Sequence, residues 1–330
     1  MEPLMIVKDL SKLYDLRSNF FESLFSKEQR YLKAVDNISF NIMPGETFGL
    51  VGESGCGKTT TGRLLINTIR ATSGQVIFEG TDLSTVHDRE SLKKLALKIQ
   101  MIFQDPYEYL SPWLNVSETL AEPLKIHKYV EKNQIDDKVR EVMETVGLTP
   151  VDMVLPKYSY QLSGGQRQRV GIARALMLNP KFLVADEPVS MLDVSIRVGV
   201  LNLLKELKKN FNLTSLFITH DIAVSRYMCD RIAVMYLGKI VEMGPTEDII
   251  SDPLHPYTQA LIAAVPVPDP SIRNEEIPIK GRIPSSGVNL PPGCRFAPRC
   301  PYSESCGNEE PELVEIGKDR FVMCHKVNKK

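Results

Sequence analysis

The hydrophobic and polar positions follow different periods in successive parts of the chain. Between residues 5 and 51 apolar and polar residues alternate, and Pro44 and Gly45 mark a turn before the apolar run at 48–51. Alternation with a period of two is typical of β-strands. We therefore predict several strands here, the last of which leads directly into a glycine-rich loop.

Beyond that loop the pattern changes to helical spacing and then to an alternation of strands and helices. We predict a helix from near Gly57 to about Ile69, and helical periodicity with interrupting prolines between 104 and 160 predicts an inserted helical subdomain. The later pattern predicts a helix, a strand, a helix and a strand at 164–177, 182–185, 195–209 and 214–219. The predicted fold class is α/β, with a mixed core sheet that is largely parallel and covered by helices.

Length and charge narrow the class of protein. The 330 residues are enough for about two domains at roughly 150 residues each. The 40 basic and 41 acidic residues nearly cancel, which gives no indication of nucleic-acid binding. The sequence has neither an apolar run of about 18 residues nor a secretory signal pattern, so we expect a cytoplasmic or peripheral protein.

A phosphate-binding loop is indicated at 52–59, where G-E-S-G-C-G-K-T matches the pattern G-x-x-x-x-G-K-[ST] between the predicted strand and helix. In this pattern backbone N–H groups approach the phosphates, Lys58 meets the β and γ oxygens, and Thr59 ligates Mg²⁺. The residues predicted to bind ATP here are Gly52, Ser54, Gly55, Cys56, Gly57, Lys58, Thr59 and Thr60.

Two further motifs complete the predicted nucleotide chemistry. Asp186 ends the apolar strand at 182–185, which places its carboxylate beside the phosphates as a magnesium ligand. The run L-S-G-G-Q-R-Q-R at 162–169 offers the hydroxyl of Ser163 and the backbone donors of Gly164 and Gly165 at a helix N-terminus, where a γ-phosphate binds well. The chain's own phosphate loop cannot easily reach this run, so we expect the phosphate to come from a partner subunit.

These motifs, in this order, resemble those of the ATP-binding-cassette ATPases. The resemblance implies that fold, ATP and Mg²⁺ as ligands, and a dimer in which the run at 162–169, including Gln166, closes over ATP of the other subunit. It implies that Glu187 is the catalytic base, that Gln104 contacts magnesium and water, and that His220 senses the γ-phosphate. Asp193 would lie in the loop that crosses the dimer interface.

Adenine needs an aromatic platform on which to stack. Tyr14 matches the position of that aromatic residue in the family, and Tyr31, just before the strand-like run at 33–36, is the alternative. The simpler interpretation of the Tyr14 ring is packing.

The runs at 255–261 (H-P-Y-T-Q-A-L) and 293–301 (G-C-R-F-A-P-R-C-P) narrow the resemblance to ATPases of dipeptide and oligopeptide importers. The run at 59–65 is more like the second, F-type, ATPase of such systems. The implied partners are a second homologous ATPase, two transmembrane permeases and an extracytoplasmic substrate-binding protein, at the cytoplasmic face of the membrane. Nickel and oligosaccharides are alternative cargoes. We expect residues 105–114 to contact a permease, with Tyr107, Tyr109 and Trp113 either there or in the local core.

We predict a nucleotide-binding domain at 1–265, with the helical subdomain at about 105–160, followed by a linker and a cysteine-rich extension at 266–330. Seven prolines lie between Pro266 and Pro292, and four of the six cysteines follow: Cys294, Cys300, Cys306 and Cys324. Their spacing lacks the short C-x2-4-C pairs of zinc sites, and clustered cysteines in a reducing compartment indicate ligation. The resemblance implies a [4Fe–4S] cluster on these four; His325 as a substitute ligand, zinc, and unligated or oxidised thiols are the alternatives.

Two other functions compete with the transport reading. A DNA-repair or translation ATPase of the same superfamily usually carries a long coiled coil or two cassettes, and this sequence has neither. A regulatory module that binds ATP without hydrolysing it would be expected to lose Glu187, Gln104 or His220, and all three are present.

Overall fold

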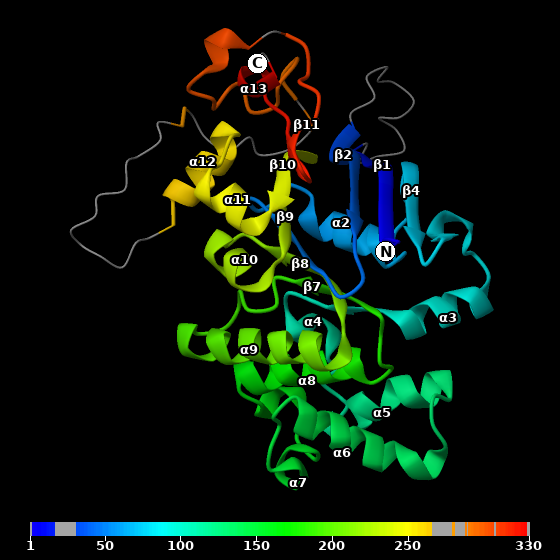
Figure 1. Ribbon diagram of the computed structural model, residues 1–330. Helices are drawn as coiled ribbons and strands as arrows, with labels where there is room; N and C mark the ends of the chain where they lie inside the picture. The colour runs from blue at the N-terminus through cyan, green and yellow to red at the C-terminus, as the bar shows by residue number, and fades with distance from the viewer. Residues whose placement is uncertain are drawn as a thin grey trace.

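The chain is built from two β-sheets with helices around them (Figure 1). The structure, a computed structural model, describes residues 2–16, 31–265, 279–280, 288, 290–306 and 308–328. Helices α5 (Val116–His127), α6 (Ile135–Thr145) and α7 (Val151–Val154) form one end of the molecule (Figure 1). The C-terminal segment forms the opposite end, with β11 (Val314–Gly317), β12 (Arg320–Val322) and α13 (His325–Asn328). Most of the predicted proline-rich linker lies outside the described residues.

The larger sheet has eight strands in the order β11-β12-β10-β9-β3-β8-β7-β6. Its strands are β3 (Thr47–Val51), β6 (Ile99–Ile102), β7 (Phe182–Asp186), β8 (Thr214–Thr219), β9 (Arg231–Tyr236), β10 (Lys239–Pro245), β11 (Val314–Gly317) and β12 (Arg320–Val322). The five strands from β9 to β6 in this order pair in parallel, whereas β10, β12 and β11 join on antiparallel. Because parallel strands end at the same edge, the segments after β3, β6, β7 and β8 meet there.

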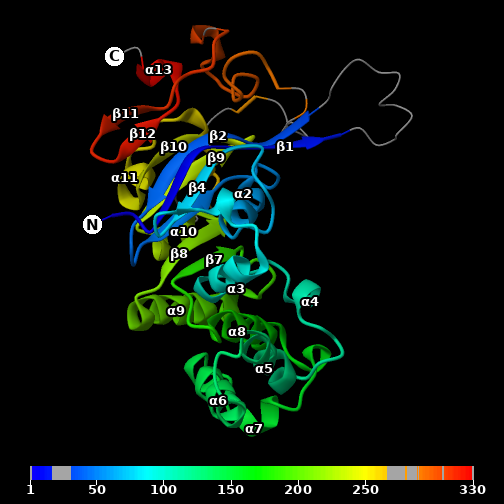
Figure 2. The same ribbon diagram turned by 90° about the vertical axis from the view of Figure 1, so that its right-hand side faces the viewer.

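The smaller sheet is antiparallel and packs against the larger one. It contains β1 (Met5–Asp15), β2 (Tyr31–Ile42), β4 (Ser73–Phe78) and β5 (Thr81–Asp82) in the order β2-β1-β4-β5. Phe40 of β2 stacks on Phe48 of β3 with ring centroids 5.0 Å apart. Figure 2 shows this sheet beside β9 and β10. The two sheets thus share one apolar core that supports the loop after β3.

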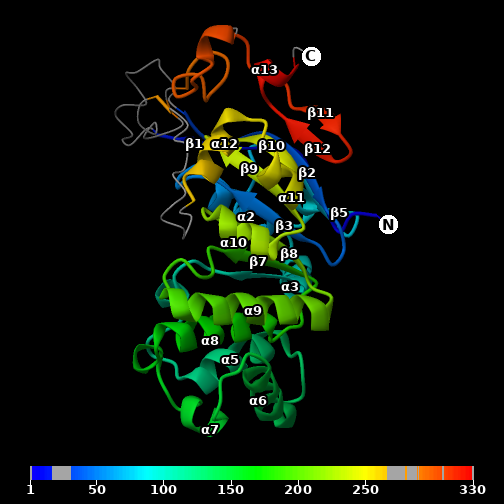
Figure 3. The same cartoon turned by 60° about the vertical axis from the view of Figure 1, so that its left-hand side comes forward.

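The α-helices lie around the larger sheet, in the separate helical end and in the C-terminal segment. They are α2 (Lys58–Leu65), α3 (Arg89–Lys98), α4 (Pro106–Tyr109), α5 (Val116–His127), α6 (Ile135–Thr145), α7 (Val151–Val154), α8 (Gly164–Leu176), α9 (Val194–Phe211), α10 (Ile222–Met228), α11 (Thr246–Ser251), α12 (Pro256–Ala263) and α13 (His325–Asn328). Figure 3 shows α8 and α9 side by side below the sheet. Among the described residues, no helix is long and apolar enough to cross a membrane.

The elements predicted after the phosphate loop lie close to the observed ones, as α8, β7, α9 and β8. The observed helix is shorter than the predicted one at 57–69, because Ile66 leaves helical geometry and Asn67 follows with φ of 58°. The hairpin β11-β12 was not predicted. It pairs with β10 through Glu242 and Met243, so the C-terminal segment extends the sheet that carries the phosphate loop.

Candidate functional site

The phosphate loop connects β3 to α2 and is shaped by its glycines. Gly57 precedes α2 with φ of 113°, a conformation that favours glycine. A Cβ atom at Gly57 would also lie 2.1 Å from the carbonyl oxygen of Ala34, so a side chain there would push the loop away from β2. The loop is therefore packed against β2 at Gly57, and it also lines a cavity.

Lys58 is the buried cation of this loop. Its Nζ donates to the carbonyl oxygens of Gly52 at 2.7 Å and Glu53 at 3.0 Å, so the ammonium group is held inside the loop. It also lines the cavity, together with Ser54, Gly55, Gly57, Thr59 and Thr60. A fixed ammonium group beside backbone N–H groups fits the charge of a triphosphate.

The residues predicted to ligate magnesium lie together at the carboxyl ends of two strands. The hydroxyl of Thr59 donates to Oδ1 of Asp186 at 3.2 Å. Burial raises the pKa of Asp186 above its usual value, while the hydrogen bond from Thr59 lowers it. Hydroxyl and carboxylate oxygens suit Mg²⁺, so Thr59 and Asp186 would hold the ion, whose charge would offset that of the phosphates.

Three side chains predicted to act in hydrolysis meet at the ends of β6, β7 and β8. Gln104 donates through Nε2 to Oε2 of Glu187 at 3.3 Å, and Nδ1 of His220 lies 3.1 Å from the same oxygen. Glu187 has φ of 45°, an uncommon conformation held by its N–H bond to Ile218 at 2.9 Å. A carboxylate with an amide and an imidazole beside it can orient a water molecule and accept its proton.

All three of these side chains face one cavity of about 620 Å³, which also contains the phosphate loop. Tyr14 of β1 forms part of its wall, with Lys12 placed 5.1 Å from the ring centroid. Among the described residues that line the cavity, Tyr14 is present and Tyr31 is not. The volume falls in the range of small-molecule sites, and one wall carries an aromatic ring where adenine would stack.

The serine-glycine run lies elsewhere on the chain. Ser163 caps α8: its Oγ accepts a bond from the N–H of Gln166, and the Gln166 side chain accepts one from the N–H of Ser163. Ser163 and Gly164 are exposed, and no residue of 163–166 is among the described residues lining the cavity. The run is thus presented outward, away from the chain's own phosphate loop.

The loop that contains Asp193 is also outward-facing. Asp193 precedes α9 and accepts backbone bonds from Ile196 and Arg197, while its side chain makes no capping bond. Met191, Val194 and Val198 are large apolar residues that are largely exposed around it. An apolar surface beside the serine-glycine run is what a subunit interface there would require.

The aromatic residues at 105–114 divide into two groups. Trp113 is 85% exposed and Tyr107 is also exposed, with the guanidinium of Arg167 lying 3.7 Å from the Tyr107 ring centroid. Tyr109 instead packs on Phe103 with ring centroids 5.2 Å apart. Of the three, Tyr109 takes the local packing role, and the other two are available for contact.

The four C-terminal cysteines do not form a metal-binding group in the structure. Among the described residues, no cluster of three or more His, Cys, Asp or Glu side chains is arranged to hold a metal ion. None of the six cysteines forms a disulfide. Burial raises the pKa of the Cys294 thiol to about 11, and burial also raises that of Cys300. The [4Fe–4S] cluster that the resemblance implies is therefore not supported by the described residues.

Two contacts to the phosphate loop come from residues that sequence analysis did not assign to the site. Tyr257 of α12 accepts a bond from the N–H of Glu53 at 2.9 Å. Arg299 donates to both carboxylate oxygens of Glu53, at 2.9 and 3.1 Å. Both residues lie in the runs at 255–261 and 293–301 that pointed to a transporter branch, but nothing in those runs indicates their partner.

Comparison with known proteins agrees with this geometry. A family model described as "ABC transporter" matches residues 35–190, and one described as "Oligopeptide/dipeptide transporter, C-terminal region" matches residues 241–306. The oligopeptide transport ATP-binding protein AppF of Bacillus subtilis is 44% identical over 98% of this chain and 97% of its own length. A putative peptide import ATP-binding protein of Brucella ovis is 45% identical over 99% and 98%.

Solved structures show the same fold. The dimeric post-hydrolysis state of the ATP-binding cassette MJ0796, bound to ADP and Pi, superposes with a TM-score of 0.64 at 29% identity, over 73% of this chain and 98% of that one. The fold class predicted from the sequence is confirmed. From its site, its sequence relatives and its fold, the chain belongs to the ATP-hydrolysing subunits of ABC transporters, in the group that carries the oligopeptide/dipeptide transporter C-terminal region.

Proposed function

We propose that this chain hydrolyses ATP to drive the import of dipeptides or oligopeptides. The observation that carries the proposal is that Gln104, Glu187 and His220 meet beside the phosphate loop, in a chain similar along its whole length to peptide import ATP-binding proteins. In this scheme Lys58 binds the phosphates and Glu187 orients and deprotonates the attacking water.

The proposal includes a dimer of ATPase subunits. Ser163 and Gly164 of the run at 162–169 are exposed, so they would bind the γ-phosphate of ATP held in the partner's cavity. Asp193 and the exposed apolar residues near it would line the contact between the subunits. Binding of ATP would close the dimer and hydrolysis would release it, and permeases would convert that movement into alternating access.

We propose that the partner is a second, similar ATPase and that the assembly includes two permeases and an extracytoplasmic binding protein, at the cytoplasmic face of the membrane. The support is the likeness of residues 59–65 to the F-type ATPase and the exposure of Tyr107 and Trp113 for a permease contact. Cargo is selected by subunits other than this chain. Oligosaccharide or nickel import uses the same machinery, and a non-transport ATPase is the alternative of a different class.

The experiment is co-purification of a tagged Glu187→Gln chain from native membranes in the presence of Mg-ATP. Loss of the base should trap the ATP-bound dimer, so mass spectrometry should identify a second ATPase and two permeases. A Lys58→Ala chain serves as the matched control, because it should bind no ATP and recover less of the partner ATPase. Recovery of soluble partners alone would contradict transport.

We also propose that residues 1–265 form the nucleotide-binding domain and that residues 266–330 form a linker and a C-terminal extension. The residues lining the cavity, among those described, all lie in the first part. The resemblance further implies a [4Fe–4S] cluster on Cys294, Cys300, Cys306 and Cys324, although the described thiols would have to move together to hold one. Iron and acid-labile sulfide measured in anaerobically purified full-length protein test this: equal amounts of both support a cluster, and absence of both rejects it.

A further inference from the structure

Glu53 is an acidic residue in the loop that binds phosphates. Glu53 lines the same cavity as Lys58 and Thr59. A carboxylate in this position repels the negative charge of a triphosphate, and the repulsion is stronger near the protein than in bulk water. The loop therefore needs a compensating charge if it is to bind ATP well.

Arg299 supplies that charge from the C-terminal segment. Its Nη1 and Nη2 donate to the two carboxylate oxygens of Glu53, and the Arg299 side chain is only 8% exposed. This fork-to-fork geometry fixes the direction of the carboxylate as well as its charge. The guanidinium is held 5.8 Å from the ring centroids of both Tyr236 and Phe296, in a buried aromatic cluster.

The N–H, the carbonyl oxygen and the carboxylate of Glu53 thus each have a hydrogen-bond partner. Its N–H donates to Tyr257, its carbonyl oxygen accepts from Lys58 at 3.0 Å, and its carboxylate accepts from Arg299. The same residue therefore links the ammonium group that meets the phosphates to the C-terminal segment.

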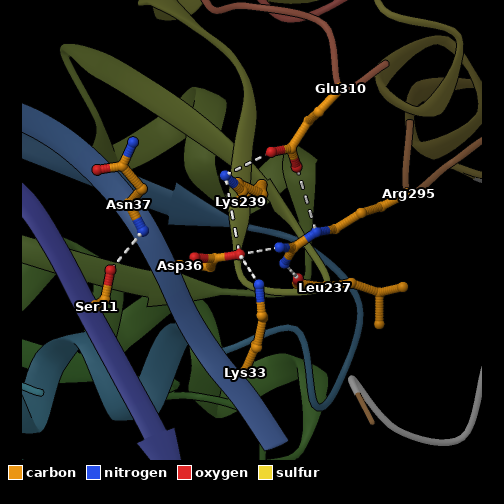
Figure 4. Close-up of polar contacts among 8 residues, drawn as sticks. All are labelled: Ser11, Lys33, Asp36, Asn37, Leu237, Lys239, Arg295 and Glu310. Atoms are coloured by element: carbon orange, nitrogen blue, oxygen red, sulfur yellow. Dashed lines mark hydrogen bonds and ion pairs between the residues drawn. The ribbon is translucent and has the colours of Figure 1, made fainter. Parts of the chain in front are cut away.

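A second arginine of that segment, Arg295, contacts Leu237 and Asp36 (Figure 4). Arg295 donates to the carbonyl oxygen of Leu237 and to the carboxylate of Asp36, and Glu310 approaches its Nε at 3.6 Å. Leu237 lines the cavity, and the neighbouring Gly238 donates to the carbonyl oxygen of Cys56 in the phosphate loop at 2.8 Å. The segment at 295–299 thus contacts the phosphate loop directly, through Arg299 and Glu53, and is also connected to it through Arg295, Leu237 and Gly238.

We propose that Arg299 is a positioning residue of the ATP site, which neutralises Glu53 and holds the phosphate loop ready for a triphosphate. The C-terminal segment is then part of the nucleotide-binding machinery of the same chain, although it contributes no atom to the cavity wall among the described residues. This rests on the nucleotide site and on no assumption about cargo.

The test is nucleotide affinity of the purified full-length chain, measured by calorimetry with ADP, AMP and a non-hydrolysable ATP analogue. Arg299→Gln should raise the Kd for the ATP analogue about tenfold, since it leaves a partly buried carboxylate unpaired beside the phosphates. The loss should decrease from the ATP analogue to ADP to AMP, as fewer phosphates meet the carboxylate. It should also diminish at high salt, which screens the repulsion.

The double variant Glu53→Gln/Arg299→Gln distinguishes charge from packing. Removing both charges should return the Kd to within about threefold of the unmodified chain. Arg320→Gln is the matched control: Arg320 joins the same C-terminal segment to Asp252 at 3.1 Å, away from the cavity, and its loss should leave nucleotide affinity unchanged. Failure of the double variant to restore affinity, or equal losses for AMP and the ATP analogue, overturns the proposal.

Glu53→Gln alone provides a second test of the proposal if Arg299→Gln does not fold. It leaves the guanidinium unpaired near the phosphates, so the Kd for the ATP analogue should be equal to that of the unmodified chain or lower. A Kd raised about tenfold overturns the inference. Binding by the unmodified chain and its loss in Lys58→Ala come first, because absence of binding there contradicts the nucleotide site itself rather than the role of Arg299.

Discussion

His255 is a buried neutral histidine at the junction between the nucleotide site and the C-terminal segment. It is 1% exposed, its Nδ1 accepts the N–H of Tyr257 at 3.0 Å, and its ring packs on Phe296 with centroids 5.6 Å apart. Burial lowers the pKa of His255 to about 3. Protonation of this side chain therefore favours the unfolded chain.

The size of the effect of pH on stability follows from the pKa values of His255 in the folded and the unfolded chain. An unfolded histidine has a pKa of about 6.5, so the contribution of His255 to stability is complete above that pH and is lost as the pH falls toward about 3. Between pH 7 and pH 5 the loss is about 2 kcal/mol. Burial raises the pKa of Glu242, which changes stability with pH in the opposite sense, so the contribution of His255 must be isolated by substitution.

His255→Asn removes the titrating group and keeps an oxygen that can accept the N–H of Tyr257 at the start of α12. When the pH is lowered from 7 to 5, we expect the free energy of unfolding of the unmodified chain to fall by about 2 kcal/mol more than that of the variant. Urea unfolding followed by circular dichroism measures it. His87→Asn, at an exposed position, should show no shift. Parallel pH profiles for the unmodified and His255→Asn chains would refute the assignment of a buried neutral histidine.

Three predictions concern the nucleotide site. Glu187→Gln should lower the rate of phosphate release by about 10²- to 10⁴-fold while the Kd for ATP is retained; a normal rate would exclude Glu187 as the base. Tyr14→Ala should weaken ATP binding by about 1–3 kcal/mol in calorimetry, and Tyr14→Phe and Tyr31→Ala should not; the reverse order would move the adenine platform to Tyr31. Asp186→Asn should reduce the gain in ATP affinity that Mg²⁺ provides and spare binding in EDTA; an unchanged magnesium dependence would remove Asp186 from the metal site.

The parts of the site that could be predicted from the sequence are those whose chemistry is local. The phosphate loop lies between a strand and a helix that are adjacent in sequence, so its glycines and Lys58 could be placed without knowledge of the rest of the fold. The carboxylates at 186 and 187 could be placed beside it because parallel strands end at one edge. The roles of Gln104 and His220 were inferred from the family resemblance, and their meeting at Glu187 in the structure fits the same rule.

The contacts that escaped prediction depend on pairs that are distant in sequence. Glu53 and Arg299 are 246 residues apart, and a glutamate within a phosphate loop gives no indication of which arginine neutralises it. The hairpin β11-β12 is short and only Val322 of its strands is buried, so it has neither the length nor the alternation that predicts a strand. The clustering of the cysteines indicated ligation, but the described residues form no group of three or more side chains that could hold a metal ion.

In the proposed dimer, the phosphates of one ATP molecule would be contacted by two structures that are held in different ways. The loop that binds the phosphates is held from within the chain, by the pair of Glu53 and Arg299 and by Tyr257. Ser163 and Gly164, which would contact the γ-phosphate from the partner subunit, are exposed and are not among the described residues that line the cavity. Closure of such a dimer would therefore regulate hydrolysis without altering the loop. Conversely, we infer that a change in the C-terminal segment alters ATP affinity before any dimer forms, so the affinity of the isolated chain reports on Arg299 independently of transport.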